Sequence, residues 1–299
     1  MPTTFDVTSA DGTRVRCWRG GTPGIPLVIA NGLGTIPEAW PALVREGSGY
    51  DALTWYHRGT FGSARPRDPA RIRVEDHVDD MVALMDDQGV ERALVACWSI
   101  GVNVAFEMAQ RHPERVAGIM AVAGVPGGTF STMGGPLRVP RRLRKPVSVS
   151  VAHLMRRTGG WLTVLGPRIP VNERLVWVLT HSGLMLPSAT PERVIPMLQQ
   201  FLTHDWRWYG ELAVAAAGHD PMDLHFVECP VTIVAGRYDV LTSMHDVVDA
   251  AAKIPHAQIS VLPGSHFLPL EHPQELHDLL DDLALRAGVD PGQAAPSPR

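Results

Sequence analysis

Cysteine is scarce in this chain, which carries only three such residues among 299. Cys17, Cys97 and Cys229 are an odd number and lie far apart in the sequence. A disulfide framework needs an even set of cysteines, and it forms in oxidising compartments. The cysteine usage therefore favours a reducing compartment over a disulfide-stabilised fold.

Long hydrophobic runs are also missing from the sequence. The longest unbroken apolar stretch, near Val116 to Val125, is far short of the roughly 20 residues that a membrane-spanning helix needs. The N-terminal residues show neither the basic region nor the apolar region of a secretory signal peptide. We therefore expect a cytoplasmic protein that does not insert stably into a membrane.

No strong excess of one charge is present either, because 27 Lys and Arg oppose 31 Asp and Glu for a net charge of −4. Nucleic-acid-binding domains usually carry a strongly basic surface, so this balance gives no support for nucleic acid as a partner. Hydrophobic residues make up 45% of the chain, which is enough for a large core. The 28 glycines and 26 prolines add many turns without reaching the level of a disordered chain.

What the chain does have is a regular alternation of strand and helix patterns. Residues Thr4 to Arg19 alternate apolar and polar around Asp11-Gly12, which predicts a β-hairpin. Apolar runs typical of buried strands then alternate with helical periodicity. The expected strands are 26–30, 52–56, 93–97 and 116–123, and the expected helices are 74–88 and 102–110. This order favours a parallel sheet covered by helices on both faces.

The alternation is interrupted once, after Gly124. Residues 125–228 contain Gly/Pro clusters, a basic run and helix-like segments such as Glu192 to Thr203, without a convincing strand. The pattern then resumes with a strand at 231–235, a helix at 243–252, a strand at 258–262 and a helix at 274–287. The sequence therefore predicts one α/β core from residues 1–124 and 229–288, with a helical insertion at 125–228. The tail 289–299, rich in small residues and proline, is expected to be disordered.

One serine stands at a turn between a predicted strand and a predicted helix. The turn reads Cys97-Trp98-Ser99-Ile100-Gly101, a variant of the G-x-S-x-G nucleophile elbow, in which a strained turn presents the serine. Gly101 meets the need for a small residue where strand and helix approach closely, whereas Cys97 is a larger substitute for the first glycine. The motif alone is weak, because most serines before a helix are ordinary N-caps.

A carboxylate and a histidine follow later predicted strands. Asp239 comes just after the strand at 231–235, and His266 comes just after the last strand, at 258–262. With Ser99, they lie at the carboxyl ends of strands, the rim where open α/β sheets bind ligands. This context and the order Ser, Asp, His resemble those of the α/β-hydrolase superfamily. The resemblance covers nearly the whole chain outside the insertion and the tail.

The resemblance implies a catalytic triad and an α/β-hydrolase fold. His266 would act as the base for Ser99, and Asp239 would orient the histidine. The insertion at 125–228 would be a helical cap that covers the site and shapes the acyl pocket. No cofactor is required by this chemistry, and the histidines show no His-Glu-x-x-His spacing that would indicate a metal.

The resemblance also implies an oxyanion hole in the loop after the strand at 26–30. This loop reads Asn31-Gly32-Leu33-Gly34, and by position the backbone N–H groups of Leu33 and Ile100 would be the donors. Asn31 stands where the family commonly has histidine, which leaves the hydrogen bonds within the loop open. The residues that would support the site are Asn31, Gly32, Trp98 and Gly101.

Other polar residues are interpreted as structural. Some relatives place the acid after the strand that follows the nucleophile helix, but residues 121–128 contain no Asp or Glu. His245 and Asp246 are expected on the surface of a helix. His219 and Asp220 end the insertion, and a structural role is favoured over a place at its mouth. The loop from Arg58 to Ser63 resembles another hallmark of the family and is also interpreted as structural.

The expected activity is hydrolysis of carboxylic esters with small to medium apolar acyl groups, through an acyl-serine. Thioester or lactone hydrolysis, C–C bond hydrolysis and cofactor-free perhydrolysis stay open, because the same triad serves them. Epoxide hydrolases and haloalkane dehalogenases are disfavoured, because both families place an Asp where Ser99 stands. Outside the enzymes, the alternative is a receptor-like ligand-binding protein on this fold.

The insertion has an unusual composition. It contains Trp161, Trp177, Trp206 and Trp208, which either form its own core or line an apolar pocket. Its eleven Lys and Arg exceed its seven Asp and Glu for a net +4, whereas the rest of the chain carries sixteen against twenty-four, a net −8. The simplest interpretation of its basic run is a solvated loop. One hypothesis is that the run attracts an anionic substrate, an acidic carrier protein or a lipid surface. The run consists of Arg138, Arg141, Arg142, Arg144 and Lys145.

Overall fold

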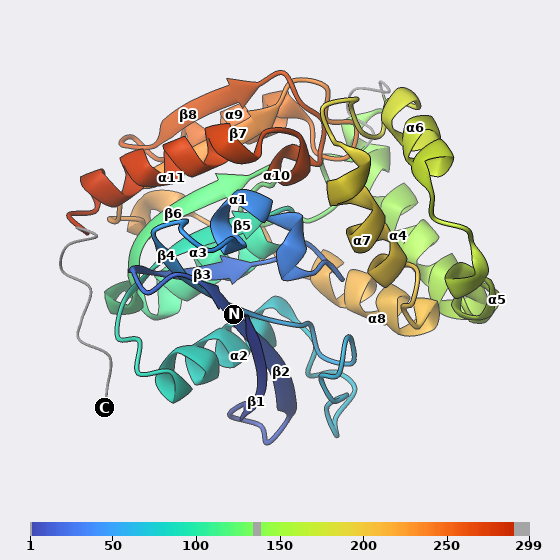
Figure 1. Ribbon diagram of the computed structural model, residues 1–299, viewed down its shortest axis with the longest axis horizontal. Helices are drawn as coiled ribbons and strands as arrows, with labels where there is room; N and C mark the ends of the chain where they lie inside the picture. The colour runs from blue at the N-terminus through green and yellow to red at the C-terminus, as the bar shows by residue number, and fades with distance from the viewer. Residues whose placement is uncertain (1, 134–138, 290–299) are drawn as a thin grey trace.

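The computed structural model describes residues 2–133 and 139–289, which form an eight-stranded sheet with helices on both faces (Figure 1). The strands lie in the order β1-β2-β4-β3-β5-β6-β7-β8. The β1–β2 and β2–β4 pairs are antiparallel, and all other neighbours are parallel. The predicted α/β fold and N-terminal hairpin are therefore confirmed. The strands are β1 (Thr3–Thr8), β2 (Arg14–Gly21), β3 (Ile25–Ala30), β4 (Tyr50–Trp55), β5 (Ala93–Trp98), β6 (Val116–Val122), β7 (Val231–Gly236) and β8 (Gln258–Leu262).

The strand order creates a switch point beside β3. The chain leaves β3 for β4 on one side and then returns to β5 on the other side. Where neighbouring strands connect in opposite directions, their loops diverge and a ligand-binding crevice opens at their carboxyl ends. The loop after β3 begins at Asn31, and the turn after β5 contains Ser99. The topology therefore brings together two segments that the sequence predicts to be functional.

Alternating side chains divide the sheet between two cores. In β5, Val95 and Cys97 belong to the core with α2, α3 and α9, whereas Leu94 and Ala96 belong to the core with α1 and α11. Every residue of β5 is buried, as expected for a central strand of a parallel sheet. The turn after β5 therefore stands on a rigid base. The α-helices that precede β6 or follow β7 are α1 (Pro41–Val44), α2 (Val74–Asp87), α3 (Gly101–Arg111), α9 (Met244–Ala251), α10 (Leu268–Glu271) and α11 (Pro273–Arg286).

Between β6 and β7 the described chain forms five α-helices, which extend from one end of the sheet (Figure 1). α8 packs closely on α4 because Gly210 stands at the contact, where a Cβ atom would lie only 2.7 Å from the backbone nitrogen of Arg156. None of the helices in the described ranges combines the length and the apolar character that a bilayer crossing requires. The five are α4 (Arg141–Thr158), α5 (Gly160–Leu165), α6 (Glu173–His181), α7 (Pro191–Phe201) and α8 (Trp206–Ala217). Single 3-10 turns are Pro37–Ala39, Pro113–Arg115, Gly166–Arg168 and Leu224–Phe226.

The basic run is not the solvated loop that the sequence predicts. Residues 141–145 form the first turn of α4, because Arg, Leu and Lys are good helix formers. Arg141 and Arg144 pair with Asp246 of α9 at 3.0 and 2.9 Å. Asp246, expected on the surface of a helix, lies on α9 with its side chain 15% exposed, and it neutralises two charges of the run. Arg138 and residues 290–299 of the predicted tail lie outside the described residues.

The loop after β4 is built around a buried arginine. Arg58 is fully buried, and its guanidinium donates to both carboxylate oxygens of Asp80 at 2.7 and 2.9 Å and to Asp11 at 2.6 Å. Burial opposes ionisation of Asp80, but hydrogen bonds from His77 and Arg58 hold its pKa below the ordinary value. The Arg58 carbonyl accepts a hydrogen bond from Trp208 of α8 at 2.7 Å. The arginine therefore ties this loop to α2, to the hairpin turn and to the insertion.

Replacement of this arginine by an apolar side chain is expected to destabilise the fold. Arg58→Met leaves the Asp80 carboxylate buried without its partner, which costs about 3–5 kcal/mol. Urea unfolding measures the loss. The free energy of unfolding of the control Arg67→Met, at an exposed position of the same connection between β4 and α2, should stay within about 0.5 kcal/mol of that of the parent. A loss below about 1 kcal/mol for Arg58→Met would show that the network contributes little.

Candidate active site

Ser99 lies on a strained turn between β5 and α3. Its backbone φ is +56°, a left-handed conformation that is unusual for a residue with a side chain. The turn is this tight because α3 begins against the end of β3. A Cβ atom on Gly101 would lie 2.0 Å from the carbonyl oxygen of Ala30, so only glycine fits. Cys97, in place of the usual first glycine, is buried, with its sulfur 3.4 Å from the carbonyl oxygen of Met120.

The structure brings Ser99, His266 and Asp239 together in one hydrogen-bonded chain. His266 Nε2 lies 3.0 Å from Ser99 Oγ, and His266 Nδ1 lies 2.8 Å from Asp239 Oδ2. The other carboxylate oxygen of Asp239 accepts the backbone N–H groups of Leu241 and Thr242, both at 2.7 Å. Because a carboxylate only accepts, Nδ1 carries the proton and Nε2 is left free to accept from the serine. This is the geometry of a base that activates a hydroxyl nucleophile.

The loop that carries His266 is held from two sides. The indole of Trp98 donates to the carbonyl oxygen of His266 at 2.8 Å. The buried Glu271 carboxylate accepts from both the backbone N–H and the hydroxyl of Ser265, each at 2.6 Å. It also accepts from the backbone N–H of Leu186 in the insertion at 2.7 Å. Glu271 is a supporting residue that sequence reasoning missed, because no motif marks a glutamate at this position.

Asn31, in the loop predicted to form the oxyanion hole, connects this loop to two buried side chains. Its amide donates to Thr54 Oγ1 at 3.0 Å, and its carbonyl oxygen accepts from the Trp40 indole at 3.0 Å. Thr35 closes the turn by donating its backbone N–H and its hydroxyl to the carbonyl oxygen of Gly32, at 3.0 and 2.8 Å. No motif in the sequence indicates that Trp40 and Thr54 bind the Asn31 side chain.

The two predicted oxyanion donors lie on the loops that meet at the switch point. Within the described residues, no hydrogen bond uses the backbone N–H of Leu33 or of Ile100. Ile100 is the residue before the first turn of α3, where the helix dipole also favours a negative charge. Gly32 passes close to the nucleophile elbow, because a Cβ atom on it would lie 3.2 Å from the Trp98 ring. Both N–H groups are therefore without a hydrogen-bond partner among the described residues.

The insertion also contacts the oxyanion loop. The Tyr209 hydroxyl of α8 donates to the carbonyl oxygen of Leu33 at 3.4 Å. A Cβ atom on Gly34, which has φ +66°, would lie 2.6 Å from His204 Nε2. His204 Nδ1 donates to the carbonyl oxygen of Phe201 at 2.6 Å, so Nε2 bears a lone pair. Tyr209 and His204 were not predicted, since helical periodicity does not show which loop of the core a helix reaches.

The four tryptophans of the insertion do not converge on a pocket. Trp161 and Trp177 are 77% and 62% exposed, on α5 and α6. Trp206 and Trp208 are buried, Trp206 against the rings of Phe201 and Tyr209, and Trp208 below the Arg58 loop. Trp206 therefore packs within the insertion, Trp208 packs between the insertion and the core, and the other two face solvent.

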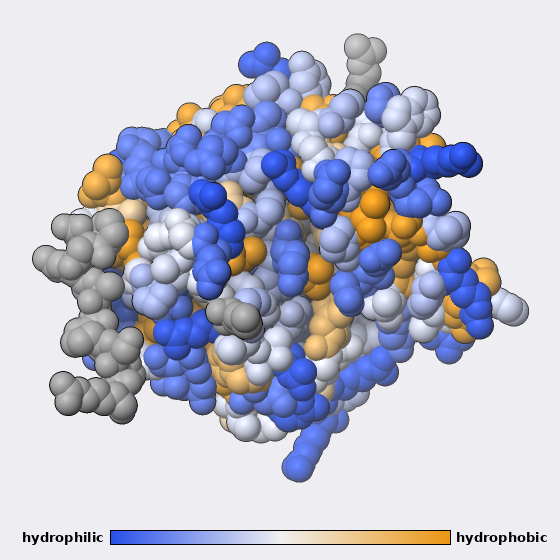
Figure 2. Space-filling view, viewed as in Figure 1, coloured by the Kyte–Doolittle hydropathy of each residue, from blue (hydrophilic) through white to orange (hydrophobic). Residues whose placement is uncertain are grey.

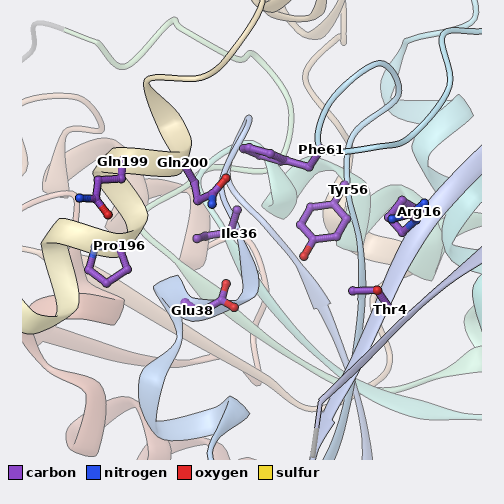
Figure 3. A pocket seen from close by; sticks show the side chains of 9 residues that line it. All are labelled: Thr4, Arg16, Ile36, Glu38, Tyr56, Phe61, Pro196, Gln199 and Gln200. Carbon is purple, nitrogen blue, oxygen red and sulfur yellow. The ribbon is translucent and has the colours of Figure 1, made fainter. Parts of the chain in front are cut away.

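A hollow of about 410 Å³ lies beside this site (Figure 3). Pro196, Gln199 and Gln200 of α7 lie on one side, with Ile36 next to Gln200, and Phe61, Tyr56 and Arg16 lie on the other side (Figure 3). Ser99 is not among its lining residues, and its wall is about as polar as it is apolar. The hollow is therefore not a simple apolar acyl pocket centred on the serine. It is lined by Thr4, Arg16, Ile36, Glu38, Tyr56, Phe61, Pro196, Gln199 and Gln200.

The remaining polar clusters are occupied by internal contacts. His219 Nε2 lies 3.2 Å from the Glu107 carboxylate, in agreement with a structural role. On α11, His277, Asp278 and Asp281 place three potential metal ligands within 4.8 Å of one another. His277 already contacts the carbonyl oxygen of Ser48 at 2.9 Å, and Asp281 accepts from the Tyr50 hydroxyl at 2.5 Å. These groups stabilise the packing of α11 on the sheet.

Burial keeps several reactive side chains in their neutral forms. It raises the pKa of the Cys97 thiol well above the ordinary value and that of the Cys17 thiol to about 12. Burial also lowers the pKa of His204, and it lowers that of His57 well below the usual range. Cys97 is therefore not a competing nucleophile beside Ser99, because only the thiolate is reactive.

Loss of the Asn31 side chain is expected to damage both stability and turnover. Asn31→Ala leaves the buried Trp40 indole without an acceptor, which costs about 1–3 kcal/mol. It also frees the loop that carries Leu33, so kcat should fall more than KM rises. Urea unfolding and steady-state kinetics measure the two effects. An unchanged kcat with lower stability would show that Asn31 supports the fold only.

Stability is expected to decline as the pH falls below about 6.5, the usual pKa of histidine. Below this pH the two histidines bind protons in the unfolded chain, whereas in the folded protein the buried His57 and His204 stay neutral. Their contribution to the free energy of unfolding is therefore complete above this pH and is lost below it. His204→Asn keeps a donor toward Phe201 and removes one such histidine. Urea unfolding between pH 7.5 and 5.5 should show a shallower decline in the variant, and equal slopes would contradict the assignment.

Comparisons with known proteins agree with this architecture. A family model described as the alpha/beta hydrolase fold matches residues 25–273. Epoxide hydrolase A of Mycobacterium tuberculosis is 33% identical over 122 residues, which are 39% of this chain and only 37% of that enzyme. RutD of Caulobacter sp. (strain K31), which is named as a carbamate hydrolase, is 24% identical over 257 residues, or 83% of this chain and 86% of RutD.

Solved structures show the same fold over most of the chain. A thermophilic esterase from Thermogutta terrifontis superposes with a TM-score of 0.71 and 19% identity, over 95% of this chain and 99% of the esterase. At this identity the likeness concerns the fold alone. The family model, in contrast, covers most of the sequence and includes the elbow, Asp239 and His266. The chain therefore belongs to the α/β-hydrolase family.

Proposed function

We propose that this protein is a serine hydrolase that cleaves carboxylic esters of small to medium apolar acyl groups. The observation that carries the proposal is the continuous chain from Ser99 Oγ to His266 to Asp239, with contacts of 3.0 and 2.8 Å. The positive φ of Ser99 and the unused N–H groups of Leu33 and Ile100 support it. Together they supply a nucleophile, a base and an acceptor site for an oxyanion.

The mechanism follows from these positions. His266 Nε2 takes the proton of Ser99 as the hydroxyl oxygen bonds to the ester carbonyl carbon. The oxygen that becomes negative is stabilised by the N–H groups of Leu33 and Ile100, each worth roughly 3–4 kcal/mol. His266 then returns the proton to the leaving alkoxide as the C–O bond breaks. Water, deprotonated by the same nitrogen, attacks the acyl carbon, and His266 returns this proton to Ser99 Oγ as the bond between the acyl carbon and Oγ breaks and the acid leaves.

The nucleophile distinguishes this reaction from that of one relative. Epoxide hydrolases resemble the chain over a third of its length, but they place an Asp where Ser99 stands. A serine forms an acyl-enzyme with a carbonyl substrate and needs a base for its proton, and His266 is in place to accept it. We therefore favour acyl transfer over epoxide opening.

The residues next to the reactive groups favour an apolar acyl chain. Leu33, Ile100 and Phe267 are each adjacent in sequence to a residue of the site, and each is only partly buried. The Phe267 ring also packs on Trp98, with ring centres 5.8 Å apart. These side chains offer hydrophobic surface beside Ser99, where an acyl chain would gain roughly 25 cal/mol for each Å² it buries.

Loss of the nucleophile is expected to abolish both labelling and turnover. A fluorophosphonate probe should modify Ser99, and Ser99→Ala should lower kcat/KM for a p-nitrophenyl ester by about 10⁴-fold or more. Ser150→Ala, at an exposed serine of α4, is the matched control and should retain full activity. Labelling that survives Ser99→Ala would disprove the assignment.

A panel of esters, thioesters, lactones and a C–C substrate of graded length separates the reactions that share this triad. Perhydrolysis is measured on the same panel with added hydrogen peroxide. We expect the highest kcat/KM for short to medium acyl esters. Labelling of Ser99 without turnover of any substrate would favour the receptor-like alternative.

A further inference from the structure

The outer surface of the insertion is unusually apolar. Of the fourteen large hydrophobic side chains that are exposed among the described residues, eleven lie between residues 143 and 178. Hydrophobic surface is visible over this end of the molecule in Figure 2. Single exposed apolar residues are normal in a folded protein, but a contiguous group marks an interaction surface. The eleven are Leu143, Val147, Val151, Leu154, Trp161, Leu162, Val164, Leu165, Ile169, Trp177 and Val178.

On α4 the exposed apolar residues form one stripe. Leu143, Val147, Val151 and Leu154 are spaced by four, four and three residues, which places them on one face of the helix. The opposite face packs on α8 through Ala152, which is buried. The stripe is therefore a second apolar face that no part of the described chain covers. Trp161 continues it on α5, which forms the far end of the molecule in Figure 1.

The same segment carries only positive charge. Residues 139–172 contain seven Arg and Lys and no Asp or Glu. Arg141 and Arg144 are paired with Asp246, and Arg156 lies 3.3 Å from Glu211. The other four basic side chains, those of Arg142, Lys145, Arg157 and Arg168, take part in no ion pair within the described residues. The exposed apolar surface is therefore accompanied by unneutralised cations.

We propose that the outer face of α4 and α5 docks on an anionic phospholipid surface. Helices that lie in a membrane interface combine Trp, Leu and Val on one face with Lys and Arg beside them. The arrangement here is the same, since Arg142 precedes Leu143 and Arg157 stands three residues after Leu154, next to it on the helix. A second copy of the chain is disfavoured, because a two-fold contact through this face would oppose like charges. A protein partner would need a groove or a flat face, whereas α5 projects at the end of the molecule (Figure 1).

The test measures how the full-length protein partitions onto vesicles. Vesicles of phosphatidylglycerol and phosphatidylcholine should bind the protein about tenfold or more better than vesicles of phosphatidylcholine alone at 0.1 M salt. Binding should be lost at 1 M salt, because the Debye length shrinks to about 3 Å. The fluorescence of Trp161 should shift to shorter wavelength on binding, since the indole leaves water.

Two variants probe the two components of the surface. Trp161→Ser removes the most exposed indole, and the double variant Arg142→Glu with Arg157→Glu reverses two free charges. Each should lower the partition coefficient on anionic vesicles by about tenfold or more. The matched controls, Leu285→Ser on α11 and Arg67→Glu in the loop before α2, alter exposed residues elsewhere and should leave it unchanged. Circular dichroism and thermal unfolding verify that all variants fold.

Four results would overturn the proposal. Equal binding to both vesicle types would show that charge does not drive docking. Unchanged binding of Trp161→Ser would show that the apolar face does not take part in it. A dimer in sedimentation velocity that Trp161→Ser converts to a monomer would assign the face to a second copy of the chain. Binding to a glutamate-rich protein without binding to vesicles would assign it to an acidic partner.

Discussion

The close approach of α3 to the end of β3 is the constraint on which the site depends. The absence of a side chain at Gly101 lets the helix begin against the carbonyl oxygen of Ala30. The connection from β5 must then turn sharply, which places Ser99 at φ +56°. The same approach reaches the next loop, because a Cβ atom on Gly101 would also lie 2.9 Å from the carbonyl oxygen of Asn31. One contact between backbones therefore sets the turn of the nucleophile against the start of the loop that carries Leu33.

The sequence predicts those parts of the site that depend on strand order. Ser99, Asp239 and His266 could be placed on one rim because each follows a strand with a clear apolar pattern, and strand ends of a parallel sheet share an edge. Contacts between distant loops could not be predicted in this way. The carbonyl oxygen of Leu33 meets Tyr209, 176 residues away, and Glu271 meets Leu186, 85 residues away. Neither pair has a local signal, because both depend on how the insertion lies on the core.

The insertion shows what hydrophobic periodicity in a sequence does not predict. Its helical character follows from the sequence, and α7 lies where apolar periodicity predicts a helix. Periodicity does not reveal whether an apolar face is covered by another element. For Trp206 and Trp208 it is covered, whereas for Trp161 and Trp177 it is not. The prediction of a solvated loop for the basic run is wrong for the same reason, because the carboxylate that pairs with Arg144 lies 102 residues further along the chain.

The insertion contacts the loop that carries Leu33, and it contacts the helices that follow the Asp239 and His266 loops. Tyr209 binds the oxyanion loop at Leu33, and Leu186 binds the Glu271 carboxylate that holds the histidine loop. Arg144 binds Asp246 on α9, the helix that follows the Asp239 loop. Three separate contacts of the insertion therefore lie within a few residues of the proposed donor Leu33, of His266 and of Asp239. Because α4 and α8 pack on each other, the helix with the exposed apolar stripe and the helix that contacts Leu33 belong to one packed unit.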